Sequence, residues 1–540
     1  MQTETSANEL AINERLLGRL LEDRAAQYGD REFLHFKGSR SISYRELNEA
    51  ANRFGNGLMG LGLGKDKKLA IMLPNCPEYL YLLFGAAKIG AVAVPINTGY
   101  KGTLLAHVLN NSDAEVLVVD EQFADTINEV AEKVPRLKTL LVYSETGVIG
   151  NRFRDSWQVL EVTTLDNSSN KPPNADVNHT DTVMILYTGG TTGPSKGVVM
   201  THHFYWSYAR MVKESIGYTE NDVSYTCMPL FHINAQIGSI VATIYAGGRV
   251  ALYQRFSARS FWDEIRNSGA TVFLGMGAVG NILAKNPPTL ADLENRVRLA
   301  VIVPPPDDLE GFERRFGLRV IFETFGMTEG LIIPPRLHEP RKRGCCGKPI
   351  ADYEVRIVDD NDRALGPNQT GELVFRPREP YTMMSGYYKM PEATLEAFRN
   401  LWFHTGDLGY LDEEGFLFYV GRKKDAIRRR GENISAYEIE TVVNEHPAVL
   451  ESAAIAVPAE LGEDDVKIVV VLKPDGKLTP EELTRFCESR MAYFMIPRYV
   501  EVVDALPKNP SQRIEKYKLR ANALSESTWD REKAGITLSR

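Results

Sequence analysis

The segment LYTGGTTGPSKGVVMTH, from Leu186 to His202, is the most informative part of this sequence. It continues the apolar run TVMIL, which has the length and composition of a buried strand. Glycines allow the positive φ angles that turn successive backbone N–H groups toward one point, threonines add hydroxyl donors, and the lysine adds a cation. The pattern predicts a phosphate-binding loop formed by Thr188, Gly189, Gly190, Thr191, Thr192, Gly193 and Lys196.

Two other interpretations of this loop are less favourable. The P-loop of nucleotide triphosphatases, GxxxxGK[ST], needs a glycine before the lysine, whereas Ser195 precedes Lys196 and Gly197 follows it. A flexible surface turn would not need so many hydroxyl groups directly after a buried strand. Phosphate binding is therefore the better hypothesis.

The bulk composition is typical of a globular protein and excludes several function classes. The 63 Lys and Arg residues against 71 Asp and Glu give a net charge of −8, so a nucleic-acid partner is not expected. No window reaches the ~18 consecutive apolar residues of a membrane span. The five cysteines lack CxxC spacing, and the acidic start MQTETSANEL lacks the pattern of an export signal. We expect a cytoplasmic protein.

Strands and helices alternate along most of the chain, which predicts crossover units and parallel sheets buried on both faces. Each parallel strand then delivers its following loop to one edge, where ligands bind in such folds. One further strand is expected over RVIFETFG, 319–326. The clearest patterns predict helices at 44–62, 77–90, 102–110 and 260–270, and strands at 69–73, 91–96, 115–120, 182–188, 223–230, 249–253, 271–275 and 298–303.

The sequence pattern changes toward the C-terminus. Short strands and turns between about 344 and 423 predict a β-rich subdomain, and the sequence after Arg422 predicts a small α+β domain with a polar tail from about Asn522. We expect domains at 1–423 and 424–540. The predicted fold class is α/β, with layered α/β subdomains and a β-rich subdomain in a large N-terminal domain.

The loop resembles the signature YTSGTTGxPKG of the adenylate-forming superfamily, which contains acyl-CoA synthetases, aminoacyl-adenylating domains and luciferases. Ordered motifs extend the resemblance from about Tyr44 to Arg520. In ETFGMTEG, 323–330, it implies that an aromatic ring stacks on adenine, that a threonine contacts phosphate or the acyl carboxylate, and that a glutamate binds Mg²⁺. The aromatic residue is Phe325, which Gly326 and Met327 follow. The threonine is Thr328 and the glutamate is Glu329.

Further motifs carry the same resemblance. In WFHTGDLGYLDEEGFLFYVGRKKD it implies that Asp407 binds the ribose hydroxyls, that Arg422 reaches ribose or phosphate, and that Lys424 is the hinge on which a mobile C-terminal domain alternates between two positions. It also implies that Gly431 lines the channel for the pantetheine of coenzyme A. His232, in MPLFHINAQIG, matches a residue that gates thiol access.

The sequence departs from the superfamily pattern at two positions. Gly189 replaces the usual serine of the loop, which removes one hydroxyl donor to phosphate. In LPKNPSQRIEKYKLR, Arg513 stands where the superfamily has the lysine that bridges carboxylate and phosphate. Lys516 matches the motif's second lysine, and Lys508 is another candidate. An extended chain would point Lys516 away from Arg513, so a swap of roles requires a turn.

The implied function is that of an ATP-dependent acyl-CoA ligase, an AMP-forming acid–thiol ligase for a small or medium carboxylic acid that uses ATP, Mg²⁺ and coenzyme A. RRRGENISAYEIE and the segment after it are most similar to crotonobetaine/carnitine-CoA ligases. One alternative is an adenylating enzyme that loads a carrier protein. Another is a catalytically weak nucleotide- or acyl-binding homologue, and a homodimer is left open.

Overall fold

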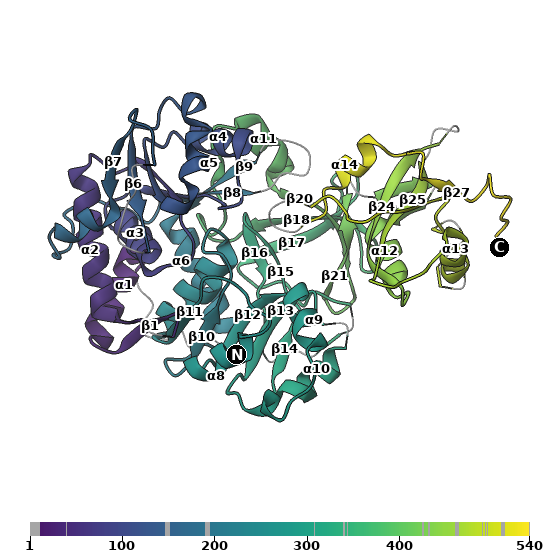
Figure 1. Cartoon of the computed structure of the whole chain (residues 1–540), viewed down its shortest axis with the longest axis horizontal. Helices are drawn as coiled ribbons and strands as arrows, with labels where there is room; N and C mark the ends of the chain where they lie inside the picture. The colour runs from purple at the N-terminus through teal and green to yellow at the C-terminus, as the bar shows by residue number, and fades with distance from the viewer. Residues whose placement is uncertain are drawn as a thin grey trace. The chain divides into compact units, whose positions relative to one another are not determined.

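The computed structural model describes residues 11–38, 40–145, 152–188, 195–306, 308–337, 341–342, 344–423, 426–429, 432–459, 464–488, 490–491, 493, 495–508 and 513–538. These residues form two compact units, and Figure 1 labels many of their helices and strands. The N-terminal unit contains the described residues of 1–189, 194–353 and 377–396, and the C-terminal unit contains those of 354–376 and 397–540. The domain boundary between 423 and 424 stays a prediction.

One sheet of the N-terminal unit carries the glycine-rich segment. Its eight strands lie in the order β19-β9-β8-β4-β3-β5-β6-β7. The pairs from β7 to β8 are parallel, whereas β8–β9 and β9–β19 are antiparallel. The strands are β3 Lys68–Met72, β4 Val92–Pro95, β5 Val116–Asp120, β6 Thr139–Tyr143, β7 Gln158–Glu161, β8 Thr182–Thr188, β9 Lys196–Thr201 and β19 Gly386–Tyr387.

Helices cover this sheet because its strands are apolar on both faces. Helix α2 begins at a capping box. The Ser43 hydroxyl accepts a hydrogen bond from the Glu46 backbone N–H, and the Glu46 carboxylate accepts one from the Ser43 backbone N–H. Figure 1 shows α1, α2 and α3 side by side. The helices are α1 Leu17–Tyr28, α2 Tyr44–Gly60, α3 Pro77–Lys88, α4 Gly102–Asn111 and α5 Ala124–Asn128.

The second sheet has seven strands in the order β14-β13-β12-β10-β11-β1-β2, all parallel except the β1–β2 pair. Its parallel strands therefore end at a common edge, as predicted. The strands are β1 Glu32–Phe36, β2 Arg40–Ser43, β10 Val223–Thr226, β11 Arg249–Leu252, β12 Val272–Met276, β13 Leu299–Val303 and β14 Arg319–Ile321. The helices that alternate with them are α6 His202–Ile216, the π-helix η5 Asn234–Val241, α7 Ala242–Ala246, α8 Phe261–Ser268, α9 Gly277–Lys285 and α10 Leu309–Phe316.

The single strand expected over 319–326 is wrong. Strand β14 ends at Ile321, and the chain then forms a separate hairpin of β15 Phe325–Met327 and β16 Gly330–Ile333. A continuous apolar and aromatic run hides such a break, because both pieces have strand composition.

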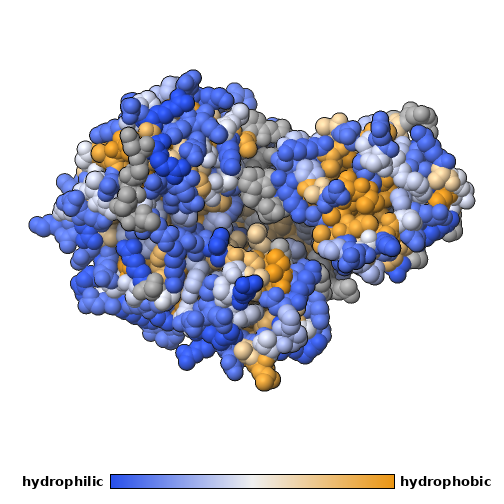
Figure 2. Space-filling model, viewed as in Figure 1, coloured by the Kyte–Doolittle hydropathy of each residue, from blue (hydrophilic) through white to orange (hydrophobic). Residues whose placement is uncertain are grey.

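The C-terminal unit holds most of a four-stranded sheet in the order β17-β18-β20-β21, a second four-stranded sheet in the order β24-β25-β26-β27, and an antiparallel pair of β22 and β23. Figure 2 shows an apolar area on the surface over β24, whereas most of the visible surface is hydrophilic. The strands are β17 Tyr353–Val358, β18 Gly371–Pro377, β20 Phe403–Leu411, β21 Leu417–Arg422, β22 Ala426–Arg429, β23 Glu432–Ser435, β24 Val449–Pro458, β25 Asp464–Leu472, β26 Tyr499–Val502 and β27 Trp529–Asp530.

The remaining helices are short. They are α11 Pro391–Ala397, α12 Ala436–Asn444, α13 Pro480–Glu488 and α14 Lys516–Ala521, with 3-10 turns at Ile12–Glu14, Glu121–Phe123, Ala131–Lys133, Val162–Asn167, Leu290–Leu293 and Arg399–Leu401. In the part of the chain that the structure describes, no helix has the length and apolar character needed to cross a membrane.

The C-terminal segment is not the polar tail expected from about Asn522. Trp529 packs against the core of the C-terminal unit, and β27 pairs with β26. Arg498 fastens this segment, since its guanidinium lies 3.3 Å from Asp530 and 2.8 Å from Asp465. A few well-placed contacts therefore anchor a segment whose composition resembles that of a tail.

Two neighbouring histidines at the start of α6 are fully buried. The His202 Nδ1 atom accepts a hydrogen bond from the Leu17 backbone N–H at 3.2 Å. Burial lowers the pKa of His202 from 6.5 to about 4, and burial together with the charge of Arg15 lowers that of His203 to about 4. Below pH 6.5 the unfolded chain binds protons that the folded chain does not, so stability falls as the pH drops toward 4.

Candidate active site

The two ends of the glycine-rich loop are held together by the antiparallel pair β8–β9. Thr188 lies opposite Lys196, and its hydroxyl is 3.5 Å from the Lys196 carbonyl oxygen. Gly197 is required here because an added Cβ would lie 2.7 Å from Ile185. The predicted residues Gly189, Gly190, Thr191, Thr192 and Gly193 lie outside the described residues.

The Lys196 side chain lies over an aromatic ring, with its ammonium 4.7 Å from the ring centre of Tyr387. Tyr387 belongs to β19, whose residues pair with Val198 and Val199 of β9. The hydroxyl of Tyr387 donates to the Glu329 carboxylate at 2.9 Å. Two predicted site residues that are 133 positions apart in the sequence, 196 and 329, thus contact one tyrosine.

Sequence reasoning missed Tyr387. It lies in the segment MMSGYYKMPEAT, 383–394, outside the motifs that carry the resemblance. The segment carried one signal, a glycine followed by two tyrosines within the predicted β-rich subdomain. Gly386 has a φ of +144°, which favours glycine, and the segment runs alongside β9.

The second nucleotide motif lies on the β15–β16 hairpin. Phe325, Met327 and Thr328 are half-buried, and Thr328 and Glu329 form the turn of the hairpin. Gly326 is exposed, and a Cβ there would lie 2.7 Å from the Leu331 side chain. The hairpin therefore carries the predicted adenine-binding residue on strand β15 and the predicted phosphate-binding residue in the turn that follows.

Glu329 has the chemistry of a magnesium ligand. Its side chain is buried, and the Tyr387 hydroxyl fixes the orientation of the carboxylate. Among the described residues there is no group of three or more His, Cys, Asp or Glu side chains that could hold a metal. A single carboxylate fits Mg²⁺, because that ion is held mainly by phosphate oxygens and water.

The predicted gate residue precedes the π-helix η5. The His232 ring lies against Phe231, with 4.5 Å between ring centres, and its backbone N–H donates to the Pro229 carbonyl at 3.0 Å. Gln236, in the π-helix, is fully buried and accepts from the Tyr205 hydroxyl. Such local π-helices are frequent at functional sites, since they shift side chains from their usual helical positions.

In the C-terminal unit, Asp407 and Arg422 face each other across β20 and β21. The Arg422 Nε atom lies 2.8 Å from Asp407 Oδ1, and the carboxylate is almost fully buried. The Asp407 backbone N–H donates to the Thr405 hydroxyl at 3.0 Å. The structure thus brings together the two residues that the motif predicted as ribose and phosphate ligands.

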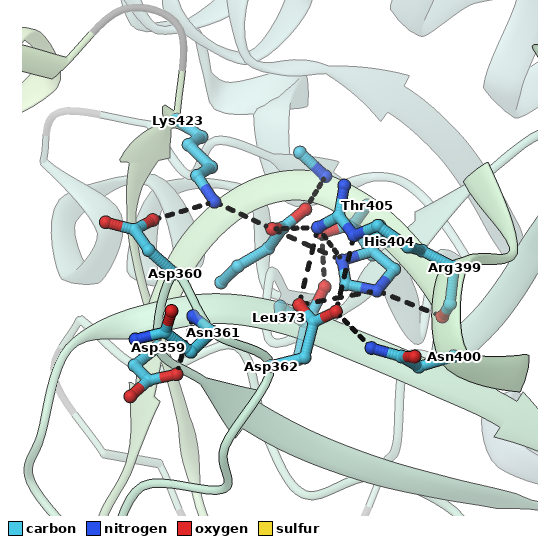
Figure 3. Close-up of polar contacts among 12 residues, drawn as sticks. Asp359, Asp360, Asn361, Asp362, Leu373, Arg399, Asn400, His404, Thr405 and Lys423 are labelled. Carbon is cyan, nitrogen blue, oxygen red and sulfur yellow. Dashed lines mark hydrogen bonds and ion pairs between the residues drawn. The ribbon is translucent and has the colours of Figure 1, made fainter. Parts of the chain in front are cut away.

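The residue before the predicted hinge is held by two carboxylates. Figure 3 shows the Lys423 ammonium directed at Asp360, from which it lies 3.1 Å, and the same ammonium lies 3.0 Å from buried Glu372. Burial alone would lower the pKa of Lys423, but these two hydrogen bonds raise it. Lys424, the predicted hinge, and Gly431 lie outside the described residues.

His404 supports the same carboxylate from the other side. Its Nδ1 atom lies 3.3 Å from Glu372, and its Nε2 atom donates to the Arg399 carbonyl oxygen at 3.2 Å. Although burial raises the pKa of Glu372, the hydrogen bonds from Lys423 and His404 lower it below its usual range. The HTGD motif therefore also anchors the strand that leads toward the predicted hinge.

The three candidate cations of the terminal motif have different surroundings. Lys516 lies 2.7 Å from Glu440, with both side chains 15% exposed, and Lys508 lies 2.6 Å from Glu451. Arg513 is exposed. The chain is not extended between Arg513 and Lys516, because Glu515, the residue directly before helix α14, has φ −90° and ψ 73°.

The sequence matches the family described as AMP-binding enzyme over residues 21–388, and the AMP-binding enzyme C-terminal domain over residues 438–513. A crotonobetaine/carnitine–CoA ligase from Salmonella agona is 33% identical over 515 residues, covering 93% of this chain and 98% of that relative. A protein of the same name from Citrobacter koseri is 33% identical over 520 residues, which cover 93% of this chain and 98% of that relative.

Two solved structures have the same fold. The anthranilate CoA ligase AuaEII in complex with anthranoyl-AMP gives a TM-score of 0.83 at 25% identity, with 98% of this chain and 99% of that chain covered. ATP-bound MatB from Rhodopseudomonas palustris also gives 0.83, at 27% identity and with 94% and 99% covered.

These relatives confirm the predicted α/β fold class with its small C-terminal domain, and the predicted activity class of ATP-dependent acyl-CoA ligation through an acyl-AMP. The roles assigned to individual site residues stay predictions. The family match spans more than half of the chain, and the similar ligases cover nearly all of it. The chain therefore belongs to the AMP-binding enzyme family of adenylate-forming CoA ligases.

Proposed function

We propose that this chain joins a small or medium carboxylic acid to coenzyme A in two steps. In the first, a carboxylate oxygen attacks the α-phosphorus of ATP, the bond to pyrophosphate breaks, and an acyl adenylate forms. In the second, the sulfur of coenzyme A attacks the acyl carbon, AMP leaves, and the thiol proton passes to solvent. The observation that carries the proposal is the convergence of Lys196 and Glu329 on Tyr387 beside the loop.

The side chains contribute mainly position and charge, since this reaction needs no covalent enzyme nucleophile. Lys196 and the Thr188 hydroxyl would bind the phosphates of ATP. Asp407 would accept hydrogen bonds from the ribose hydroxyls, with Arg422 holding its carboxylate in place. Glu329 would hold Mg²⁺, which supplies positive charge to the phosphates when bound.

The acid would bind at the carboxyl edge of the seven-stranded sheet. Met276 and Val303 end neighbouring strands, stand opposite each other in register, and are 46% and 41% exposed. Two exposed apolar side chains at this edge favour an uncharged carbon chain over the quaternary ammonium of a betaine, which would gain most from an aromatic or acidic site. We infer that aliphatic or aromatic acids whose carbon chain carries no charge are the better substrates.

A panel of carboxylic acids tests this proposal. Purified protein is mixed with ATP, Mg²⁺, coenzyme A and either a betaine or an acid whose carbon chain is uncharged. The amounts of AMP, pyrophosphate and thioester are then measured. We expect equal amounts of the three products with the acids whose carbon chain is uncharged. Release of ADP, or no pyrophosphate from folded protein with any acid, would overturn the proposal, and transfer only to a carrier-protein thiol would assign the loading function instead.

A matched pair of lysine variants ties the activity to the loop. Lys196→Ala should abolish pyrophosphate release. Lys389→Ala is the control, because Lys389 lies over the ring of the adjacent Tyr388 at 5.6 Å and pairs with Asp113. Equal activity of the two variants would refute the role of Lys196.

A further inference from the structure

Tyr387 makes two different contacts with the proposed nucleotide machinery. Its ring face carries the Lys196 ammonium at 4.7 Å, and its hydroxyl donates to Glu329 at 2.9 Å. The side chain thus contacts both the cation and the carboxylate that the proposed function assigns to the phosphates and to Mg²⁺.

The backbone around Tyr387 holds the side chain in position. Its N–H donates to the Thr394 hydroxyl at 2.9 Å, and the next residue's N–H donates to the Gly197 carbonyl at 2.7 Å. On the other side, the Met384 N–H donates to the Glu329 carbonyl oxygen at 3.0 Å. Residues 384–388 therefore connect the end of the glycine-rich loop to the hairpin turn that carries Glu329.

We propose that Tyr387 is a positioning residue that sets the geometry of Lys196 and Glu329 for binding ATP together with its metal. This inference rests on the proposed function. A carboxylate that ligates a metal is commonly fixed by a neighbouring hydrogen-bond donor, and loss of that donor lowers metal affinity. A cation held over an aromatic face is likewise restricted in position, although it stays able to meet an anion.

The adjacent Tyr388 provides a matched control. Its hydroxyl also donates to a carboxylate, that of Asp113 at 3.1 Å, and its ring also lies beneath lysine ammonium groups, those of Lys68 at 5.2 Å and Lys389 at 5.6 Å. Tyr387→Phe and Tyr388→Phe each remove one hydroxyl and one carboxylate contact. They differ in which carboxylate is affected.

The test measures ATP binding without acid or coenzyme A, by calorimetry over a series of Mg²⁺ concentrations and by electron paramagnetic resonance with Mn²⁺. For Tyr387→Phe we expect the half-saturating metal concentration to rise about 10- to 100-fold. For Tyr388→Phe we expect no change. Tyr387→Leu, which also removes the ring, should in addition weaken metal-free ATP binding by roughly 2- to 5-fold.

Thermal unfolding of all three variants separates this effect from a structural one, since loss of packing alone would lower the melting temperature without changing the metal dependence. Equal metal dependence of the two Phe variants, with a wild type that binds ATP normally, would overturn this inference alone. A folded wild type that binds no ATP would overturn the proposed ligase function and this inference with it.

Discussion

Replacement of Arg513 by alanine should slow formation of the acyl adenylate far more than the transfer of the acyl group to coenzyme A. A cation that bridges carboxylate and phosphate acts only in the first step, where negative charge accumulates at the α-phosphorus. Removal of one such charge-stabilising donor typically lowers kcat by about 100- to 1,000-fold. We expect a loss of that size in pyrophosphate release.

The other two candidate cations, Lys516 and Lys508, each lie in an ion pair that would have to break before they could act on ATP. Lys516 lies 2.7 Å from Glu440, and both side chains are only 15% exposed. To act on ATP, Lys516 would first have to break this half-buried ion pair. If that pair contributes about 1 to 3 kcal/mol, only about one molecule in 5 to 150 has Lys516 released. Lys508 has a similar partner in Glu451.

The assay separates the two half-reactions. Pyrophosphate release reports the first, and thioester formation from a chemically synthesised acyl adenylate reports the second. Lys516→Ala is the matched control. It should lower stability more than adenylation, because Glu440 then loses the ammonium group that lies 2.7 Å away. An equal loss in both half-reactions for Arg513→Ala, or a larger adenylation defect in Lys516→Ala, would refute the reasoning.

Three further predictions follow from described contacts. Asp407→Ala should lower kcat/KM for ATP by about 100-fold, because it removes the proposed ribose acceptor and leaves Arg422 without its 2.8 Å partner; initial rates over a range of ATP concentrations check this. Because buried His202 stays neutral, the free energy of unfolding should fall by about 3 kcal/mol as the pH drops from 6.5 to about 4. Urea unfolding at both pH values should show that His202→Asn lacks this part of the pH dependence of stability. Lys423→Met should lower the unfolding free energy by about 1 to 3 kcal/mol, because it removes a cation from the buried carboxylate of Glu372, whereas Lys423→Arg should retain most of it.

The sequence predicted the layered fold because its signals were local and strong. The helix predicted at 44–62 corresponds to α2, and the strand predicted at 69–73 corresponds to β3. It failed where tertiary contacts decide the outcome. Whether the apolar run from 319 to 326 stays one strand depends on the partner of each half, and the C-terminal segment is ordered by Trp529 and Arg498.

The candidate site was predictable only where a motif carried its own chemistry. One motif predicted both Asp407 and Arg422 as ligands, and the strand register places them 2.8 Å apart. The contact of Lys196 and Glu329 with Tyr387 was not predictable, because no pattern in the sequence links the segment after Gly386 to β9. Antiparallel addition of a two-residue strand leaves too short a signal to detect.

The Asp407–Arg422 pair bears on how the site stays folded before nucleotide binds. A buried carboxylate without a partner is costly, and Asp407 is 3% exposed, so the guanidinium compensates for its burial in the absence of ribose. A carboxylate has about four acceptor positions on its two oxygens, so it can accept a ribose hydroxyl and keep Arg422. The ion pair therefore orients Asp407 for nucleotide binding, and binding need not break it. A variant that keeps the charge, Arg422→Lys, should lose orientation through its less rigid donor and raise KM for ATP more than it lowers stability.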